Sequence, residues 1–302
     1  MSIITIDNLT KDYGHGRGVF DISFNVEAGE VFGFLGPNGA GKTTAIRHIM
    51  GFSRPDKGRT SVYGLESWKD SDKIQNKLGY LPGEIALPEN LTGAEFIQMM
   101  AKLRHVKDNK HTNYLLERFD LDPSGNLKRM SLGMKRKLAI VTAFMHDPEV
   151  LVLDEPTSGL DPLMQDVFIE FIKEEKARGK TILMSSHIFK EVDLTCDRIA
   201  IIKDGQIVSM VVANDIRHNE NKTFKLEFNS QKDYERFIED KMPIKSKKPH
   251  KNQVKIEIMD DKVNELITLI ADYDLKFISE IKFTLEDYFM HFYDRNEKGS
   301  VN

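Results

Sequence analysis

The sequence predicts an α/β protein in which helices cover a mostly parallel sheet, followed by a small α+β domain. A glycine-rich loop joins a buried strand to a helix, and from residue 131 the pattern returns to alternating helix and strand. Such alternation favours a parallel sheet, because each connecting helix packs back onto the strands. Past about residue 218 the pattern becomes that of a separate unit of short strands and helices. We therefore expect one domain over residues 1–217 and an accessory domain over 218–302.

The composition is that of an ordinary globular protein, with 302 residues, 40% hydrophobic and 30% charged. A net charge of −4 argues against a strongly basic surface for nucleic acid. The single cysteine, Cys196, excludes an internal disulfide and fits a reducing cytoplasm. The N-terminus does not read as a signal peptide, and no run approaches the roughly 18 apolar residues of a membrane span. If the protein acts at a membrane, another chain must supply the spans.

Residues 1 to about 35 alternate and turn like a small antiparallel β arm, with strands expected over 3–6, 18–26 and 31–35. Period-two alternation of apolar side chains is typical of strands that bury one face. The run 59–63, which follows a turn over 56–58, is expected to be one more strand of this arm.

Residues 36–43 read Gly-Pro-Asn-Gly-Ala-Gly-Lys-Thr, a complete G-x-x-x-x-G-K-T loop between a buried strand and a helix that stops at Gly51. Its glycines let successive N–H groups point at phosphate oxygens, and the helix N-terminus adds a positive dipole. Lys42 then reaches the β- and γ-phosphates, and the Thr43 hydroxyl completes a Mg²⁺ shell. The loop predicts binding of a nucleoside triphosphate. The residues expected to contact it are Gly36, Asn38, Gly39, Ala40, Gly41, Lys42, Thr43 and Thr44.

The chain then changes character, and we expect a helical insertion over about 84–146. Thr92-Gly93-Ala94-Glu95 is a capping box that opens a helix. Phe96, Met99, Met100 and Leu103 fall on one face of it, which predicts either core or a subunit contact. A short helical stretch is expected over 111–119, and a helix over about 132–145.

A buried strand over 150–153 ends in two acids, Asp154 and Glu155. Beside the phosphate loop, Asp154 is placed to hold Mg²⁺, usually through water. Glu155 is placed to polarise a water against the γ-phosphate. A helix after Asp161-Pro162, a strand over 181–185, a helix near 188–195 and a hairpin turning at Asp204-Gly205 complete the domain.

The tail is predicted to fold as β-α-β-α-β-α, with strands over 223–228, 254–259 and 275–282. Helices are expected near 231–240, 261–271 and 285–293. Residues 245–251 form a basic segment between the first helix and the second strand. Such a segment could contact lipid headgroups or nucleic acid, but we interpret it as a solvated loop.

Several further motifs carry a family resemblance. Residues 130–135, Met-Ser-Leu-Gly-Met-Lys, resemble the signature motif of ATP-binding cassette (ABC) ATPases, and 156–161 resemble the D-loop of that family. Ser185-Ser186-His187 is similar to its switch histidine, and Asp12-Tyr13-Gly14 to its adenine-stacking loop. With the phosphate loop and the acid pair, these motifs occur in the family's order over residues 1 to about 215. The resemblance implies a P-loop ABC ATPase domain, with a RecA-like mostly parallel core, an antiparallel β arm and a helical subdomain.

The resemblance also implies roles for single residues. Tyr13 would stack on adenine, and His187 would contact the γ-phosphate and hold the attacking water. Ser131 and Gly133 would meet the γ-phosphate of ATP bound to a second copy, at a helix N-terminus that suits an anion. Asp161, at the end of the D-loop, counts among the nucleotide-binding residues. Catalysis would rest on Lys42, Glu155 and His187, with ATP and Mg²⁺ as cofactors and no zinc.

Two departures from the family pattern stand out. The signature has Leu132 and Met134 where glycine and glutamine are usual, although Ser131 and Gly133 are kept. In the Q-loop the family usually has glutamine straight after the proline, whereas here Gly83 follows Pro82. Some members carry an acid nearby, so we assign Glu84 as a Mg²⁺ contact beside Thr43 and Asp154.

The segment 283–289 resembles the ending of ATPase subunits of bacterial two-component exporters of drugs, antimicrobial peptides and peptide toxins. The resemblance implies a dimer of identical or paralogous ATPase subunits on the inner face of the membrane, working with a separate permease and without nucleic acid. The helical insertion and the loop near Gly83 would clasp a short cytoplasmic helix of that permease.

Two alternatives remain. One is a soluble ABC ATPase acting on ribosomes or nucleic acid, although the stretch between Lys42 and Ser131 has no heptad run like that of chromosome-maintenance members. The other is a scaffold that binds ATP without hydrolysis, which the presence of Glu155 and His187 disfavours. The permease normally selects the substrate, so the sequence leaves it open.

Overall fold

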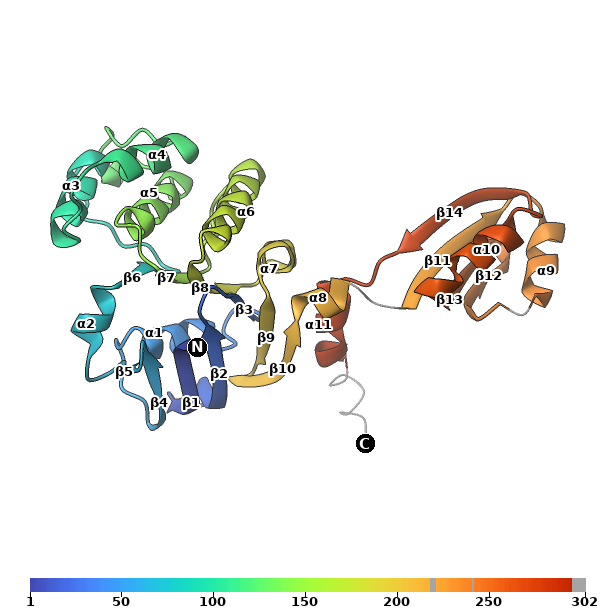
Figure 1. The fold of residues 1–302 in the computed structure, drawn as a ribbon, viewed down its shortest axis with the longest axis horizontal. Helices are drawn as coiled ribbons and strands as arrows, with labels where there is room; N and C mark the ends of the chain where they lie inside the picture. Colours follow the sequence, from blue (N-terminus) through green and yellow to red (C-terminus); the bar gives the residue numbers. More distant parts are fainter. Residues whose placement is uncertain (218–220, 241, 295–302) are drawn as a thin grey trace. The chain divides into compact units, whose positions relative to one another are not determined.

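The computed structural model describes residues 1–217, 221–240 and 242–294. The chain forms two compact units, Met1–Ala213 and Asn214–Asn302 (Figure 1). The division falls inside the short helix α8 (Ala213–Arg217). The functional division that we expected at residue 217 stays a prediction. Within the described ranges, no helix combines the length and apolar character needed to cross a bilayer.

A six-stranded sheet of order β10-β9-β3-β8-β7-β6 forms the centre of the first unit. Strands β3 (Val31–Leu35), β6 (Leu78–Leu81), β7 (Val150–Asp154), β8 (Thr181–Ser186) and β9 (Arg198–Lys203) run parallel. Strand β10 (Gln206–Val212) pairs antiparallel with β9, as the predicted hairpin requires. Every residue of β3, β7 and β8 is buried, which is typical of parallel strands covered on both faces. The mostly parallel core is confirmed.

The antiparallel arm is a second sheet, of order β2-β1-β4-β5. It contains β1 (Ser2–Asp12), β2 (Gly18–Glu27), β4 (Lys57–Val62) and β5 (Leu65–Glu66). The expectation that residues 31–35 belong to this arm is wrong, because β3 lies between β8 and β9 in the parallel sheet. The physical reason is visible in the burial: β3 is apolar on both faces, whereas β2 largely alternates between buried and more exposed residues.

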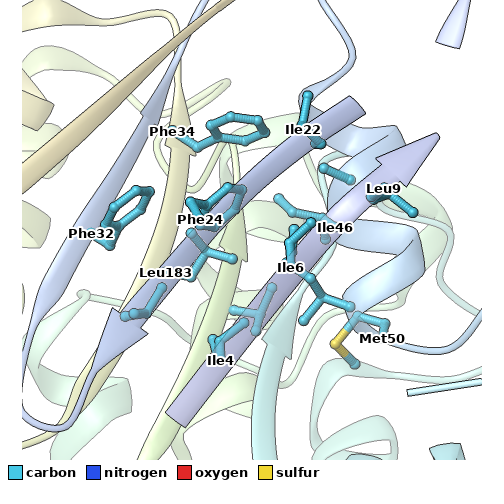
Figure 2. Close-up of a cluster of buried hydrophobic side chains, with 14 of the residues drawn as sticks. Ile4, Ile6, Leu9, Ile22, Phe24, Phe32, Phe34, Ile46, Met50 and Leu183 are labelled. Atoms are coloured by element: carbon cyan, nitrogen blue, oxygen red, sulfur yellow. The ribbon is translucent and has the colours of Figure 1, made fainter. Parts of the chain in front are cut away.

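The two sheets share one hydrophobic core with the helix α1 (Lys42–Ile49) (Figure 2). Ile4 and Ile6 of β1 and Ile46 of α1 all belong to this cluster. Phe24 of β2 stacks on Phe32 of β3, with ring centroids 5.0 Å apart. Because β3 and α1 are both anchored here, the phosphate loop between them is held at two ends.

Helices α3 (Gly93–Leu103), α4 (Lys110–Arg118) and α5 (Leu132–Phe144) gather in one group, with α5 in contact with the other two (Figure 1). The predicted capping box is confirmed, since Thr92 and Glu95 bond reciprocally. The apolar face of α3 is divided. Phe96 and Ile97 are buried, whereas Met99 is 37% and Leu103 63% exposed. The remaining helices of this unit are α2 (Ser71–Gln75), the 3₁₀ turn η1 (Leu127–Arg129), α6 (Pro162–Ala177) and α7 (Phe189–Thr195).

The second unit contains a four-stranded antiparallel sheet of order β12-β13-β11-β14. Its elements are β11 (Asn221–Phe228), α9 (Gln231–Glu239), β12 (Ile244–Lys248), η2 (Pro249–Lys251), β13 (Gln253–Met259), η3 (Asp260–Lys262), α10 (Val263–Ile270), β14 (Leu275–Ile281) and α11 (Leu285–Asp294). The order β-α-β-β-α-β is that of a ferredoxin-like unit. The solvated loop expected over 245–251 is therefore wrong for its first part. Residues 244–248 form the edge strand β12, in which four of the five residues are exposed to solvent. A strand that is exposed on both faces lacks the alternation of apolar and polar residues by which strands are predicted.

Candidate phosphate-binding site

The backbone of the predicted phosphate loop depends on its glycines. Gly39 and Gly41 have φ of 83° and 110°, in the left-handed region that residues with a Cβ avoid. A Cβ on Gly36 would lie 2.5 Å from the Ile202 carbonyl oxygen, and one on Gly41 would lie 2.8 Å from that of Gly18. Ala40, between them, is buried. The loop therefore keeps its curl only with glycine at these positions.

A hollow of about 320 Å³ lies against this loop. It brings Tyr13, from the N-terminal arm, together with the phosphate loop and with Glu155 from the end of the parallel sheet. Arg17 and Arg47 also line it, and sequence reasoning missed both. Arg47 could have been found, because it lies one helical turn after Thr43 on the same face of α1. The lining residues are Tyr13, Arg17, Gly18, Asn38, Gly39, Gly41, Lys42, Thr43, Thr44, Arg47 and Glu155.

Lys42 is folded into the loop that carries it. Its side chain is 4% exposed, and Nζ donates to the carbonyl oxygens of Gly36 at 2.6 Å and Pro37 at 3.1 Å. Nζ also forms an ion pair with Glu155 Oε1 at 2.9 Å. The ammonium is thus fixed at the loop with a carboxylate as counter-charge, where an incoming phosphate would compete for it.

Asp154 is fully buried at the carboxyl end of β7. Ser185 Oγ donates to its Oδ1 at 2.5 Å, while Oδ2 is buried and has no hydrogen-bond partner in the described part of the chain. An unpartnered buried carboxylate oxygen next to a phosphate site suits Mg²⁺ or a water bound to it. A Cβ on Gly83 would lie 3.0 Å from Oδ2, so glycine leaves this oxygen room. Thr43 and Asp154 are the residues that fit the cation.

Glu155 joins the candidate catalytic residues. Besides its ion pair with Lys42, its Oε2 lies 2.5 Å from Nδ1 of His187, which follows β8. The Glu155 backbone has φ of 49°, an unfavourable value for a residue with a Cβ. Its N–H donates to the carbonyl oxygen and to Oγ of Ser185, both at 3.1 Å, which holds this conformation in place. Lys42, Glu155 and His187 therefore form one continuous chain of contacts.

Other predicted site residues lie outside the hollow. Glu84 is exposed in the loop after β6 and does not line it. Ser131 Oγ accepts from the Met134 N–H at 3.2 Å and caps α5, and Asp161 Oδ1 accepts from the Met164 N–H at 3.0 Å and caps α6. A Cβ on Gly133 would lie 3.1 Å from the Gly159 carbonyl oxygen, so the start of α5 contacts the D-loop segment. Their roles toward nucleotide stay predictions.

A buried arginine ties three elements around the acid pair. Arg136 of α5 is 2% exposed and donates to the carbonyl oxygens of Pro82 at 2.9 Å, Gly83 at 2.6 Å and Ser158 at 2.9 Å. It thereby links the signature helix to the loop after β6 and to the segment after Glu155. The sequence did not single out Arg136, because Lys135 and Lys137 beside it are also basic and the pattern does not show which of the three side chains is buried.

Glu191 of α7 closes this network on its other side. Its Oε2 accepts from Ser186 Oγ at 2.6 Å and from Thr157 Oγ1 at 3.3 Å. It therefore joins the segment after Glu155 to the segment before His187. Burial raises the pKa of the Glu191 carboxyl to about 7. A glutamate on a short helix gives no signal in sequence that distinguishes it from a solvent-facing one.

The raised pKa of Glu191 predicts a dependence of stability on pH. The fold favours the protonated carboxyl, so this stabilisation is complete below the ordinary pKa of 4.5 and is lost as pH rises through about 7. Glu191→Gln keeps a neutral side chain at every pH. We expect urea unfolding of this variant to change less across that range than unfolding of the wild type. Glu170→Gln, on the exposed part of α6, is the control, and equal pH profiles for all three proteins would contradict the assignment.

Comparison with known proteins identifies close relatives. Residues 19–158 match the ABC transporter family. The linearmycin resistance ATP-binding protein LnrL of Bacillus subtilis is 37% identical over 71% of this chain and 70% of its own. The bacitracin transport ATP-binding protein BcrA of Bacillus licheniformis is 31% identical over 96% of both. A solved ATP-binding subunit of an ABC transporter is 32% identical, with a TM-score of 0.66, over 72% of this chain and 92% of that one.

Proposed function

This chain belongs to the ATP-binding proteins of ABC transporters, which are ATPases, and we propose that it powers export through a separate membrane permease. The observation that carries the proposal is the chain of contacts Lys42–Glu155–His187 at the edge of the phosphate-loop hollow. A cation, a carboxylate and an imidazole in contact beside the phosphate loop support the binding and hydrolysis of a γ-phosphate there. The exporter assignment is supported by relatives named for linearmycin resistance and bacitracin transport, the second matching both units of this chain.

In the proposed reaction Tyr13 stacks on adenine, and the loop N–H groups with Lys42 bind the phosphates. Thr43 and Asp154 would hold Mg²⁺, which would supply positive charge to the phosphates. When Lys42 binds the γ-phosphate instead of Glu155, the Glu155 carboxylate loses its ion pair and can accept a hydrogen bond from water. The water oxygen bonds to the γ-phosphorus, the bond to the β–γ bridging oxygen breaks, and the water proton passes to Glu155 or phosphate. His187 holds Glu155 in place throughout.

A second ATPase subunit is part of the proposal. Ser131 is exposed at the N-terminus of α5, and it does not line the hollow of its own chain. Ser131 Oγ accepts from the Met134 N–H, but its own O–H can still donate to the γ-phosphate of a nucleotide held by the partner. Whether that partner is an identical or a paralogous chain depends on the transporter.

The permease would contact the helical group. The apolar face that we considered for this contact consists of Phe96, Met99 and Met100, of which Phe96 is buried, Met100 half-buried and Met99 exposed. Leu103, one helical turn after Met99, is exposed beside them. Arg136 ties the neighbouring loop at Gly83 to α5, so a movement at this surface would reach the segment after Glu155. We accordingly place the protein at the inner face of the membrane, held there by its permease.

The proposal is tested by affinity purification of the Glu155→Gln variant with ATP and Mg²⁺ from detergent-solubilised cells. A protein with several membrane spans is expected to co-purify. The further change Met99→Glu/Leu103→Glu should remove it, whereas Gln98→Glu, on an exposed part of the same helix, should not. Recovery of ribosomal proteins or nucleic acid without a membrane protein would instead support a soluble ABC ATPase.

A further inference from the structure

Two lysines face each other at the centre of the second unit's sheet. Lys225 of β11 and Lys255 of β13 are direct cross-strand partners. Ser246 of β12 pairs with Lys255 on one side, and Ser279 of β14 pairs with Lys225 on the other. The four strands thus carry one row of two lysines flanked by two serines. Like charges directly opposite each other destabilise a sheet.

This row lies on the face opposite the core. The residues next to the lysines along each strand, Leu226, Val254 and Ile256, are buried in a cluster with Phe237 of α9 and Leu266 of α10. Since successive side chains of a strand point to opposite faces, both lysines point away from these helices. Both are nevertheless only half exposed, which strengthens their mutual repulsion.

A hollow of about 250 Å³ lies at the row, lined by both lysines together with Ser246, Lys248 and Lys251. Lys225 Nζ lies 5.4 Å from the centroid of the Phe277 ring, a contact that leaves its charge in place. Within the described residues, none of these four lysines forms an ion pair. Other lysines of the unit do, such as Lys222 with Asp260 and Lys262 with Glu265.

The carboxylates on the same face are already occupied. Glu227 is bound by Lys276 at 2.6 Å, and Glu257 by Lys245 at 3.0 Å. Glu227 still attracts Lys225 at longer range, but within the described ranges neither carboxylate forms a direct ion pair with a lysine of the hollow. Protection of a sheet edge against pairing explains lysines on β12. It does not explain Lys225 and Lys255, which lie on the two inner strands.

We propose that this hollow binds a phosphate-bearing ligand. Lysine ammonium groups act as point charges for phosphate oxygens, and the Ser246 hydroxyl, which lines the hollow, adds a donor. An anion between Lys225 and Lys255 converts their repulsion into attraction to a common partner. The phosphate belongs either to a small soluble molecule or to a phospholipid headgroup. An extended nucleic acid fits less well, because the ion-paired Glu227 and Glu257 flank the row, so the unpaired positive charge does not continue along these two strands.

The test measures the binding of pyrophosphate to the full-length protein by isothermal titration calorimetry. The variant Lys225→Gln/Lys255→Gln removes the central pair. The control Lys222→Gln/Lys262→Gln removes the same charge from lysines that are paired elsewhere. The phosphate loop also takes pyrophosphate, so wild type and control should show a second site that the central variant lacks or binds at least about tenfold more weakly. ATP hydrolysis should persist in both variants, which reports an intact first unit.

Flotation with vesicles identifies the source of the phosphate. Binding to phosphatidylglycerol but not phosphatidylcholine vesicles, lost in the central variant alone, supports a headgroup ligand. Pyrophosphate binding without vesicle binding supports a soluble ligand. Equal behaviour of the central variant and the control in both assays would overturn the proposal. Binding of a single-stranded RNA oligonucleotide through these lysines, with no pyrophosphate site, would overturn it in favour of nucleic acid.

Discussion

Replacing Glu155 with glutamine is expected to lower the rate of ATP hydrolysis by about 10²–10⁴-fold while ATP binding is retained. The amide cannot accept the water proton, and it no longer forms the ion pair with Lys42 that lies at 2.9 Å in the wild type. Lys42 then has no competing carboxylate, so nucleotide affinity should stay equal or rise. Phosphate release measures the rate, and fluorescent-nucleotide titration measures the affinity.

The control for this variant is Glu89→Gln, which changes an exposed glutamate in the loop before α3. Its turnover should equal that of the wild type. Size-exclusion chromatography with ATP and Mg²⁺ should show a dimer of the Glu155→Gln protein, because the ATP that holds the two subunits together is no longer hydrolysed. Normal turnover in Glu155→Gln would remove this residue from the role of base.

Arg136→Met is expected to lower the free energy of unfolding by about 3–5 kcal/mol. Its guanidinium supplies the hydrogen bonds to the carbonyl oxygens of Pro82, Gly83 and Ser158, all of which lose a buried donor in the variant. Its charge also faces the carboxylates of Asp154, Glu155 and Glu191, which would be left without this cation. Urea denaturation measures the loss.

The same variant should lower kcat for ATP hydrolysis more than it weakens ATP binding. The phosphate loop contacts of Lys42 do not involve Arg136, whereas the segment after Glu155 is held by it. Arg136→Lys should restore little, because one ammonium cannot reach three carbonyl groups that lie on two separate segments. Lys137→Met is the matched control on the same helix, where, among the residues that the structure describes, the lysine donates only to the Asp120 carbonyl oxygen at 3.2 Å. Equal loss in both methionine variants would contradict the role of Arg136.

Local sequence patterns predicted the individual segments of the site but not how these segments come together. The loop over 36–43 requires its residues at consecutive positions, and the strand ending in Asp154 and Glu155 is likewise continuous. The same reasoning misplaced β3 in the arm, because a strand's own residues do not state which sheet it joins. It read β12 as a loop, because an edge strand with polar side chains on both faces lacks the alternation that reveals strands.

The phosphate loop, the acid pair, the capping box of α3 and the parallel α/β core could all be predicted from sequence, since each depends on residues within a few positions of one another. The position of Glu155 between Lys42 and His187, the hydrogen bonds of Arg136 to the loops around residues 83 and 158, and the pairing of Lys225 with Lys255 became known from the folded chain alone. These contacts join residues distant in sequence. Their energies depend on burial and on the direction of each side chain, which arise only when the sheets and helices pack together.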